Sequence, residues 1–244
     1  MPHRFDPRPA AQAFWRSAAT PRAFPCELRP AIAEVLPVAV IGLPRLTLAS
    51  AAEWLRSRGA SCFRYTADRA LCGCLVAQRG HGFIFLDSTL PAEEERLTLA
   101  HETAHFVHHY RGPRDAALAA LGAAIRPVLD GDRVPTSAEI LSGVIRGVRI
   151  GTYHHAIERF DDGLPDATTL RLETEADLIG LELLAPSDRV AATTPPGEPR
   201  REALCRTYGL PSSAATAWAG WIDAHRAPDA LIARLEDHRQ KNRA

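Results

Sequence analysis

The segment His101-Glu102-Thr103-Ala104-His105 constrains this chain more than any other part of its sequence. Two histidines four residues apart lie on one face of a helix, so both imidazoles can bind the same zinc ion. Glu102 is turned about 100° from His101 around the helix axis, which places its carboxylate beside such an ion. A carboxylate there can take a proton from water and later deliver it to a leaving amine. The spacing therefore predicts a helix with a catalytic zinc site, one ion per chain.

Apolar residues surround this segment, which predicts that the helix is buried. They are Leu97, Leu99, Ala100, Ala104, Phe106 and Val107. Polar side chains on a buried helix need partners because burying them unpaired costs free energy, and a metal ion supplies one. The alternative is a solvated polar face that also includes His108 and His109. We favour the metal site because the apolar neighbours argue for burial.

A catalytic zinc ion needs a third protein ligand and an open coordination position. His108 shares the face of the two motif histidines, but three ligands from one helix are awkward to bring to one ion. The acidic and apolar segment Leu172–Leu184 is a better source, and Glu175 and Glu182 share one of its faces. Either glutamate could equally be a surface carboxylate on an amphipathic helix. Less favoured candidates are His154 and His155.

The pattern around these segments predicts an α+β fold that is mostly helical. Two β-prone runs, Leu71–Ala77 and His81–Leu86, flank glycines that suit a tight turn, which predicts a small antiparallel hairpin beside the metal-site helix. Pro91 and the acidic run Glu93–Glu95 suit the first turn of that helix. Short helices are expected towards the C-terminus.

Composition breaks divide the chain into three expected parts. A stretch rich in Pro and Arg predicts a loosely ordered segment at 1–24, and the linker-like sequence Thr193–Gly197 precedes a C-terminal helical region at 198–244. Between them, 25–190 is expected to form the metal-site domain, with a mostly helical insertion at 111–170.

Charge and cysteine usage exclude several classes of function. The formal net charge is zero, so no global field attracts nucleic acid or anionic membranes. No apolar run approaches the roughly 20 residues of a membrane helix. The five cysteines are irregularly spaced, and with an N-terminus unlike a secretory signal they favour reduced thiols and the cytoplasm. The helices expected at 201–208 and 212–221 have helix-turn-helix spacing, but the second is too apolar to read bases, so direct nucleic-acid binding is not expected.

Two stretches resemble the ImmA/IrrE-type zinc metallopeptidase family. The first is Arg96–His105 with His109, and the second is Glu175–Pro186, which is similar to the family pattern of glutamate, Ala, Asn or Asp, then small and apolar residues ending Leu-Leu-x-Pro. The resemblance implies a zincin-like domain. It implies further that His101 and His105 are zinc ligands, that Glu102 is the base and that Glu175 is the third ligand.

The resemblance also carries expectations about the substrate. Phe83–Leu86 resembles the strand that borders the family's cleft, so Phe83 and Phe85 are expected to contact a substrate backbone added to that strand. The oxyanion stabiliser is open between Tyr153 and His154, with Tyr110 a further candidate, and each could instead be a packing residue. Family members are implied to be regulatory endopeptidases that cleave a helix-turn-helix repressor. The alternative is a catalytically silent zinc-binding scaffold that regulates a transcription factor by binding, with 111–170 filling the cleft.

Overall fold

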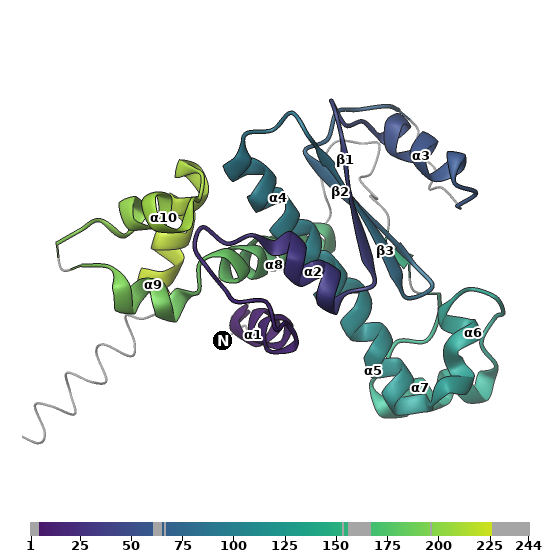
Figure 1. Cartoon of the computed structure of the whole chain (residues 1–244). Helices are drawn as coiled ribbons and strands as arrows, with labels where there is room; N and C mark the ends of the chain where they lie inside the picture. Colours follow the sequence, from purple (N-terminus) through teal and green to yellow (C-terminus); the bar gives the residue numbers. More distant parts are fainter. Residues whose placement is uncertain are drawn as a thin grey trace, which may run out of the picture.

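A computed structural model describes residues 5–60, 65, 67–152, 154–155, 167–195 and 197–225. The described residues form one mixed sheet with the strand order β1-β3-β2-β4, packed between helices (Figure 1). Strand β1 is parallel to β3, and the other neighbours are antiparallel. The strands are β1 (Val38–Leu43), β2 (Gly73–Gln78), β3 (His81–Asp87) and β4 (His154–His155). The predicted α+β class, mostly helical with C-terminal helices, is confirmed.

Helices account for most of the remaining described residues. They are α1 (Arg8–Ser17), α2 (Leu28–Val35), α3 (Leu48–Ser57), α4 (Ala92–Ala104), the π-helix η1 (His105–Arg111), α5 (Gly112–Leu121), the short 3-10 helix η2 (Ala123–Ile125), α6 (Arg126–Leu129), α7 (Ser137–Arg146), α8 (Ala167–Leu184), α9 (Ser187–Thr193) and α10 (Arg200–Tyr208). A further helical segment covers 212–225. In the described ranges, no helix combines the length and the apolar character that crossing a membrane requires.

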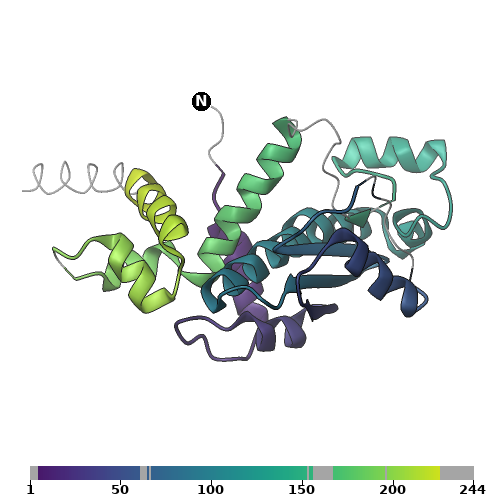
Figure 2. The ribbon, with the colours of Figure 1, turned by 90° about the horizontal axis from the view of Figure 1, so that it is seen from above.

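The N-terminal part contains a packed helix that its composition did not predict. Within 1–24, which we expected to be loosely ordered, α1 forms a helix whose Ala11 and Phe14 are buried in the main core. The apolar face of α1 packs against α8, so burial supplies the order that the composition did not predict. Helices α9 and α10 lie at one end of the molecule and α5 to α7 at the other (Figures 1 and 2). The division of the chain into domains stays a prediction.

The predicted hairpin is confirmed as β2 and β3. Their register runs from Gly73 opposite Leu86 to Gln78 opposite His81. Arg79 and Gly80 join them with positive φ angles of 52° and 86°, which is the backbone that two-residue hairpin turns require. Strand β1 was not predicted, because a short apolar run without clear alternation does not distinguish a strand from a helix.

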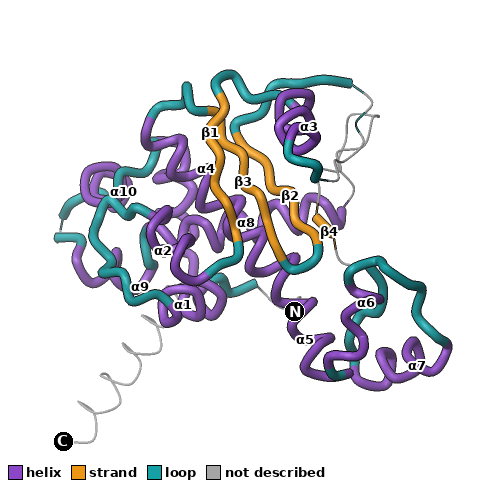
Figure 3. Tube along the Cα trace, turned by 45° about the vertical axis from the view of Figure 1, so that its right-hand side comes forward, coloured by secondary structure: helices purple, strands orange, loops and turns teal. Residues whose placement is uncertain are grey.

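The two faces of the sheet pack against different helices. Leu75 and Ile84 point into the main core, which α1, α2, α4 and α8 share. Cys74 and Phe85 point to the opposite face, where they pack with Leu55 of α3. Figure 3 shows the backbone of α3 beside the sheet. The alternation of side chains along a strand thus separates the face that meets α4 from the face that meets α3.

Helix α4 continues into η1 and α5 without a break, and its geometry changes at His105. Pro91 is its N-cap, and Glu93, Glu94 and Glu95 lie in the first turn, as the sequence predicted. From His105 the backbone is π-helical. Such segments are rare and often occur at functional sites, and their wider turns change the angular positions of the residues that follow.

Helix α8 crosses α4 in close backbone contact at Gly180. A Cβ atom on Gly180 would lie 3.1 Å from the backbone nitrogen of His101 and 3.2 Å from the carbonyl carbon of Ala100. Both neighbours are helix backbone and cannot rotate away. The absence of a side chain at Gly180 therefore allows α8 to approach the first histidine of the motif.

We expect Gly180→Ala to destabilise the protein by roughly 1–3 kcal/mol, because the added methyl group must push two helices apart. Urea unfolding measures this. Gly220 is the matched control: it is also helical, and a Cβ there would meet no atom within 4 Å. Alanine at Gly220 should be neutral or stabilise by up to about 1 kcal/mol through helix propensity. Equal stability of the two variants would contradict close packing at the crossing.

Candidate metal centre

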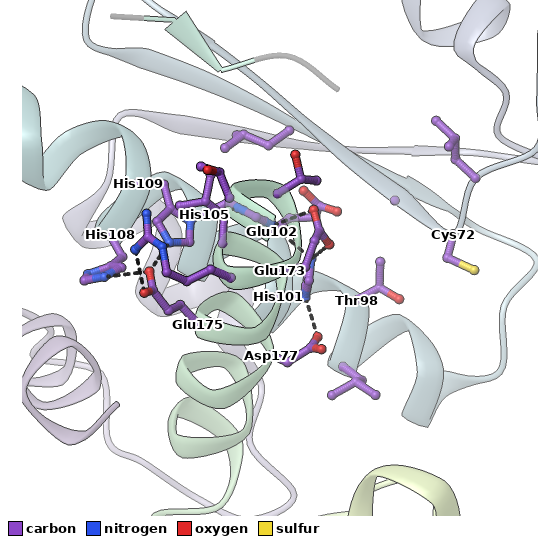
Figure 4. Close-up of a pocket in the computed structure, with 18 of the residues that line it drawn as sticks. Cys72, Thr98, His101, Glu102, His105, His108, His109, Glu173, Glu175 and Asp177 are labelled. Atoms are coloured by element: carbon purple, nitrogen blue, oxygen red, sulfur yellow. Dashed lines mark hydrogen bonds and ion pairs between the residues drawn. The ribbon is translucent and has the colours of Figure 1, made fainter. Parts of the chain in front are cut away.

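The motif histidines lie in a cleft of about 1160 Å³ where α4 and η1 meet α8 beside strand β2 (Figure 4). Cys72, Gly73 and Leu75 form the wall on the side of the sheet. The histidines and carboxylates that line the cleft are His101, Glu102, His105, His108, His109, Glu173, Glu175 and Asp177. The segment 111–170, expected to be an insertion, contributes Pro113, Arg149, Thr152, Thr168 and Thr169 to the lining.

The two motif histidines point at a common position. Nε2 of His101 and Nε2 of His105 lie 3.0 Å apart. Two nitrogens bound to one tetrahedral zinc ion at 2.0–2.1 Å would be roughly 3.3 Å apart, so only a small adjustment separates the pair from zinc geometry. His105 is buried and His101 is half-buried. The i, i+4 spacing thus produces the convergence that the sequence predicted.

Glu173 of α8 completes the group. Its Oε2 lies 3.3 Å from Nε2 of His101, and its Oε1 lies 3.7 Å from Nε2 of His105. The three ligand atoms are within 4.8 Å of one another. Two imidazoles and one carboxylate are a donor set of catalytic zinc sites, so the residues present fit a zinc ion.

Glu175, expected to be the third ligand, lies elsewhere in the structure. Its Oε2 is 3.1 Å from Nε2 of His109 and 3.7 Å from Nε2 of His108, and Arg171 donates to its Oε1 at 2.8 Å. Residues two apart on an α-helix point in directions about 200° apart, so Glu173 and Glu175 cannot face the same ion. In this structure Glu173, and not Glu175, lies with the two motif histidines.

Asp177 contacts the ring nitrogen of His101 that does not face His105. Its Oδ1 lies 2.8 Å from Nδ1 of His101. Because the carboxylate accepts, this nitrogen carries a proton, so Nε2 is the atom that can lose its proton and bind a metal ion. Asp177 follows Glu173 by one helical turn and therefore shares its face. This i, i+4 acidic pair is the sequence signal that could have identified Glu173.

The carboxylates give the site a negative potential. Burial alone lowers the pKa of His101, but the hydrogen bonds to Asp177 and Glu173 and the charge of Glu102 outweigh it and raise the pKa to about 10. The charges that stabilise a proton on His101 also stabilise a divalent cation that replaces the proton. The electrostatics of the site therefore match a cation.

Glu102 lies in the wall of the cleft beside the donor set, and only 8% of it is exposed (Figure 4). It is close to Cys74, whose pKa is raised by burial and further by the charge of Glu102. Cys74 is therefore a neutral thiol, and it lies outside the two groups of described residues that could hold a metal.

Phe83 and Phe85 do not border the cleft. Both pack with Trp54 of α3, at ring-centroid distances of 5.6 and 5.4 Å, on the sheet face opposite α4. Their strand β3 is central, and β1 and β2 occupy both of its edges. The expectation that these residues contact a substrate backbone is wrong, because a strand paired on both sides cannot accept another strand.

Strand β2 is the edge that meets the cleft. Within the described ranges, Ala77 and Gln78 also pair with β4, whereas Gly73–Val76 pair with β3 alone. Cys72, Gly73 and Leu75 line the cleft from this edge.

The residues expected to stabilise an oxyanion are only partly described. Tyr153 and the side chain of His154 lie outside the described residues, and the backbone of His154 pairs with Gln78. The third candidate, Tyr110, is buried, and its hydroxyl accepts a hydrogen bond from the Gly80 amide at 2.6 Å. Tyr110 is therefore a packing residue. Arg149 also lines the cleft, and an isolated arginine carries no signal in the sequence.

A family model matches part of this chain. Residues 62–127 match the model of the IrrE N-terminal-like domain, Peptidase M78. This match supports the resemblance of that segment to the ImmA/IrrE-type family. The matched segment contains the hairpin, α4 and η1, and with them His101, Glu102 and His105. It ends before α8, so the assignment of Glu173 rests on the structure alone.

Searches of curated proteins and of solved structures found no match. The match to this family model suggests a protein like the zinc metallopeptidases. The groups of histidine and glutamate side chains in the structure are consistent with this.

We expect Asp177→Ala to weaken zinc binding by roughly tenfold, at the low end of the effects of such supporting carboxylates, because Asp177 is two-thirds exposed. Asp177→Asn should lose less, since its amide oxygen can still accept from His101. Competition with a chelator measures the affinity. Asp188, an exposed residue of α9, is the control. An affinity of Asp177→Ala equal to that of Asp188→Ala would rule out this support.

Proposed function

We propose that this chain is a zinc-dependent endopeptidase that hydrolyses a protein substrate. One observation carries the proposal: the carboxylate Glu102 lies beside a group of two histidines and one glutamate, in a cleft bordered by a strand edge. A structural zinc site needs neither a neighbouring acid–base group nor a surface that binds extended peptides. The family match supports the same conclusion.

In this proposal His101, His105 and Glu173 hold the zinc ion. A zinc ion in this position supplies Lewis acidity, which acidifies water and polarises the scissile carbonyl. Glu102 accepts the proton of the attacking water and passes it to the amine that leaves. Because Glu102 is buried, bulk solvent competes little for this carboxylate.

The substrate is proposed to bind in extended form along Gly73–Val76 of β2, which pair with β3 alone among the residues that the structure describes. Main-chain hydrogen bonds to Gly73–Val76 would add one strand to the sheet and carry the scissile bond past the metal group. Because such bonds are made to the backbone, recognition tolerates many side chains. The substrate class that we propose, a helix-turn-helix repressor, rests on the family resemblance.

We expect Glu102→Gln to cleave at least about 100-fold more slowly than wild type, while it binds the same amount of zinc. Both zinc-loaded proteins are incubated with a proteome-derived peptide library and with purified helix-turn-helix repressors, and new termini are identified by mass spectrometry. Glu93→Gln, an exposed change in the first turn of the same helix, is the matched control and should cleave normally.

Two results would argue against this mechanism. Cleavage by Glu102→Gln at the wild-type rate would remove Glu102 as the base. Stoichiometric zinc without Glu102-dependent cleavage of any substrate would instead favour the silent zinc-binding scaffold.

A further inference from the structure

A second cluster of polar side chains lies directly behind His105, outside the proposed donor set. It consists of His108, His109, Glu175 and Arg171 (Figure 4). The side chains of His109 and Glu175 are only 7% and 11% exposed. Burying a histidine and a carboxylate together costs free energy unless they are paired, so their arrangement requires an explanation.

These groups form a continuous chain of contacts that ends at a motif histidine. Nδ1 of His105 lies 3.0 Å from Nδ1 of His109. Nε2 of His109 lies 3.1 Å from Oε2 of Glu175. Arg171 donates to the other oxygen of Glu175 at 2.8 Å. The chain begins where the helix becomes π-helical, which sets the offset between His105 and His109.

The placement of protons along this chain follows from the first acceptor. An ionised Glu175 only accepts, so Nε2 of His109 carries a proton. A neutral imidazole has one N–H, so Nδ1 of His109 accepts, and Nδ1 of His105 must donate to it. His105 then has no proton on Nε2. Its lone pair points towards Nε2 of His101 and towards Glu173.

We propose that His109 and Glu175 are positioning residues that hold His105 in the tautomer and orientation that metal binding requires, with Arg171 anchoring Glu175. The inference rests on the zinc site of the proposed function, but not on proteolysis. Both histidine ligands are then supported by a carboxylate of α8. Asp177 contacts His101 directly, and Glu175 acts on His105 through His109.

The same cluster can be interpreted as a second metal site, because ligand atoms of His108, His109 and Glu175 lie within 4.8 Å of one another. Two observations oppose this. A cation on Nε2 of His109 would move the proton of His109 to its Nδ1, so that His109 would donate to Nδ1 of His105. His105 would then carry its proton on Nε2 and could not bind the metal ion of the first site. Arg171 also already neutralises Glu175. The two sites exclude each other, so the chain should bind one zinc ion.

The test measures zinc stoichiometry and affinity by chelator competition in four variants. His109→Leu and Glu175→Ala should each bind zinc roughly 10–100-fold more weakly than wild type. His109→Asn should recover most of the affinity, since its amide oxygen occupies the place of Nδ1 and can accept from His105. His108→Gln is the matched control: it neighbours the same glutamate at 3.7 Å but lies outside the chain, and it should bind normally.

A second readout separates positioning from folding. Nitrogen-15 spectra of histidine-labelled, zinc-loaded wild type should show a proton on Nδ1 of His105 and on Nε2 of His109. This assignment needs no variant, so it stays decisive if His109→Leu does not fold. Urea unfolding of His109→Asn and His108→Gln checks that their zinc affinities compare equally folded chains.

Three results would overturn the inference. They are wild-type affinity in His109→Leu, the opposite tautomers in the spectra, and two zinc ions per wild-type chain with the second lost in His108→Gln. A wild type that binds no zinc at all would remove the proposed function as well. A zinc affinity that does not change in the His109 variants would overturn this inference but not the proposed function.

Discussion

The backbone contact between α8 and α4 at Gly180 is the constraint on which the candidate site depends. The motif helix supplies two histidines and one glutamate, but it cannot supply a carboxylate that faces both histidines. Helix α8 provides that carboxylate only because Gly180 allows it to lie against the backbone of His101. Glu173 and Asp177, on the turns before Gly180, are then carried to the histidines. A wider crossing would move Glu173 and Asp177 away from the two histidines and separate the donors.

The parts of the fold that local rules determine could be predicted from the sequence. The histidine pair follows from the helical repeat, and the hairpin follows from its turn residues and two β-prone runs. The choice between Glu173 and Glu175 is not local. It depends on the rotation of α8 about its axis, which is set by the packing of Ala176, Ile179 and Gly180 in the core. A resemblance in sequence order shows which helix carries the ligand, but the packing decides which face of that helix meets the metal.

The same limit explains the outcome at Phe83 and Phe85. The resemblance of Phe83–Leu86 to the strand that borders the family's cleft does not determine strand order, which is a long-range property. Strand β1 pairs with β3 and makes β3 central, and among the described residues Gly73–Val76 of β2 pair with β3 alone. The alternation of side chains then places Phe85 against α3. Both outcomes depend on β1, whose short apolar sequence did not distinguish it from a helix.

The central claim is that zinc binds between His101, His105 and Glu173. Crystals of the zinc-loaded protein, measured at the zinc absorption edge, test it most directly. The account predicts one anomalous peak about 2.0–2.2 Å from Nε2 of both histidines and from one oxygen of Glu173, with Glu175 still paired to His109. A peak coordinated by Glu175, or one located between His108 and His109, would contradict it.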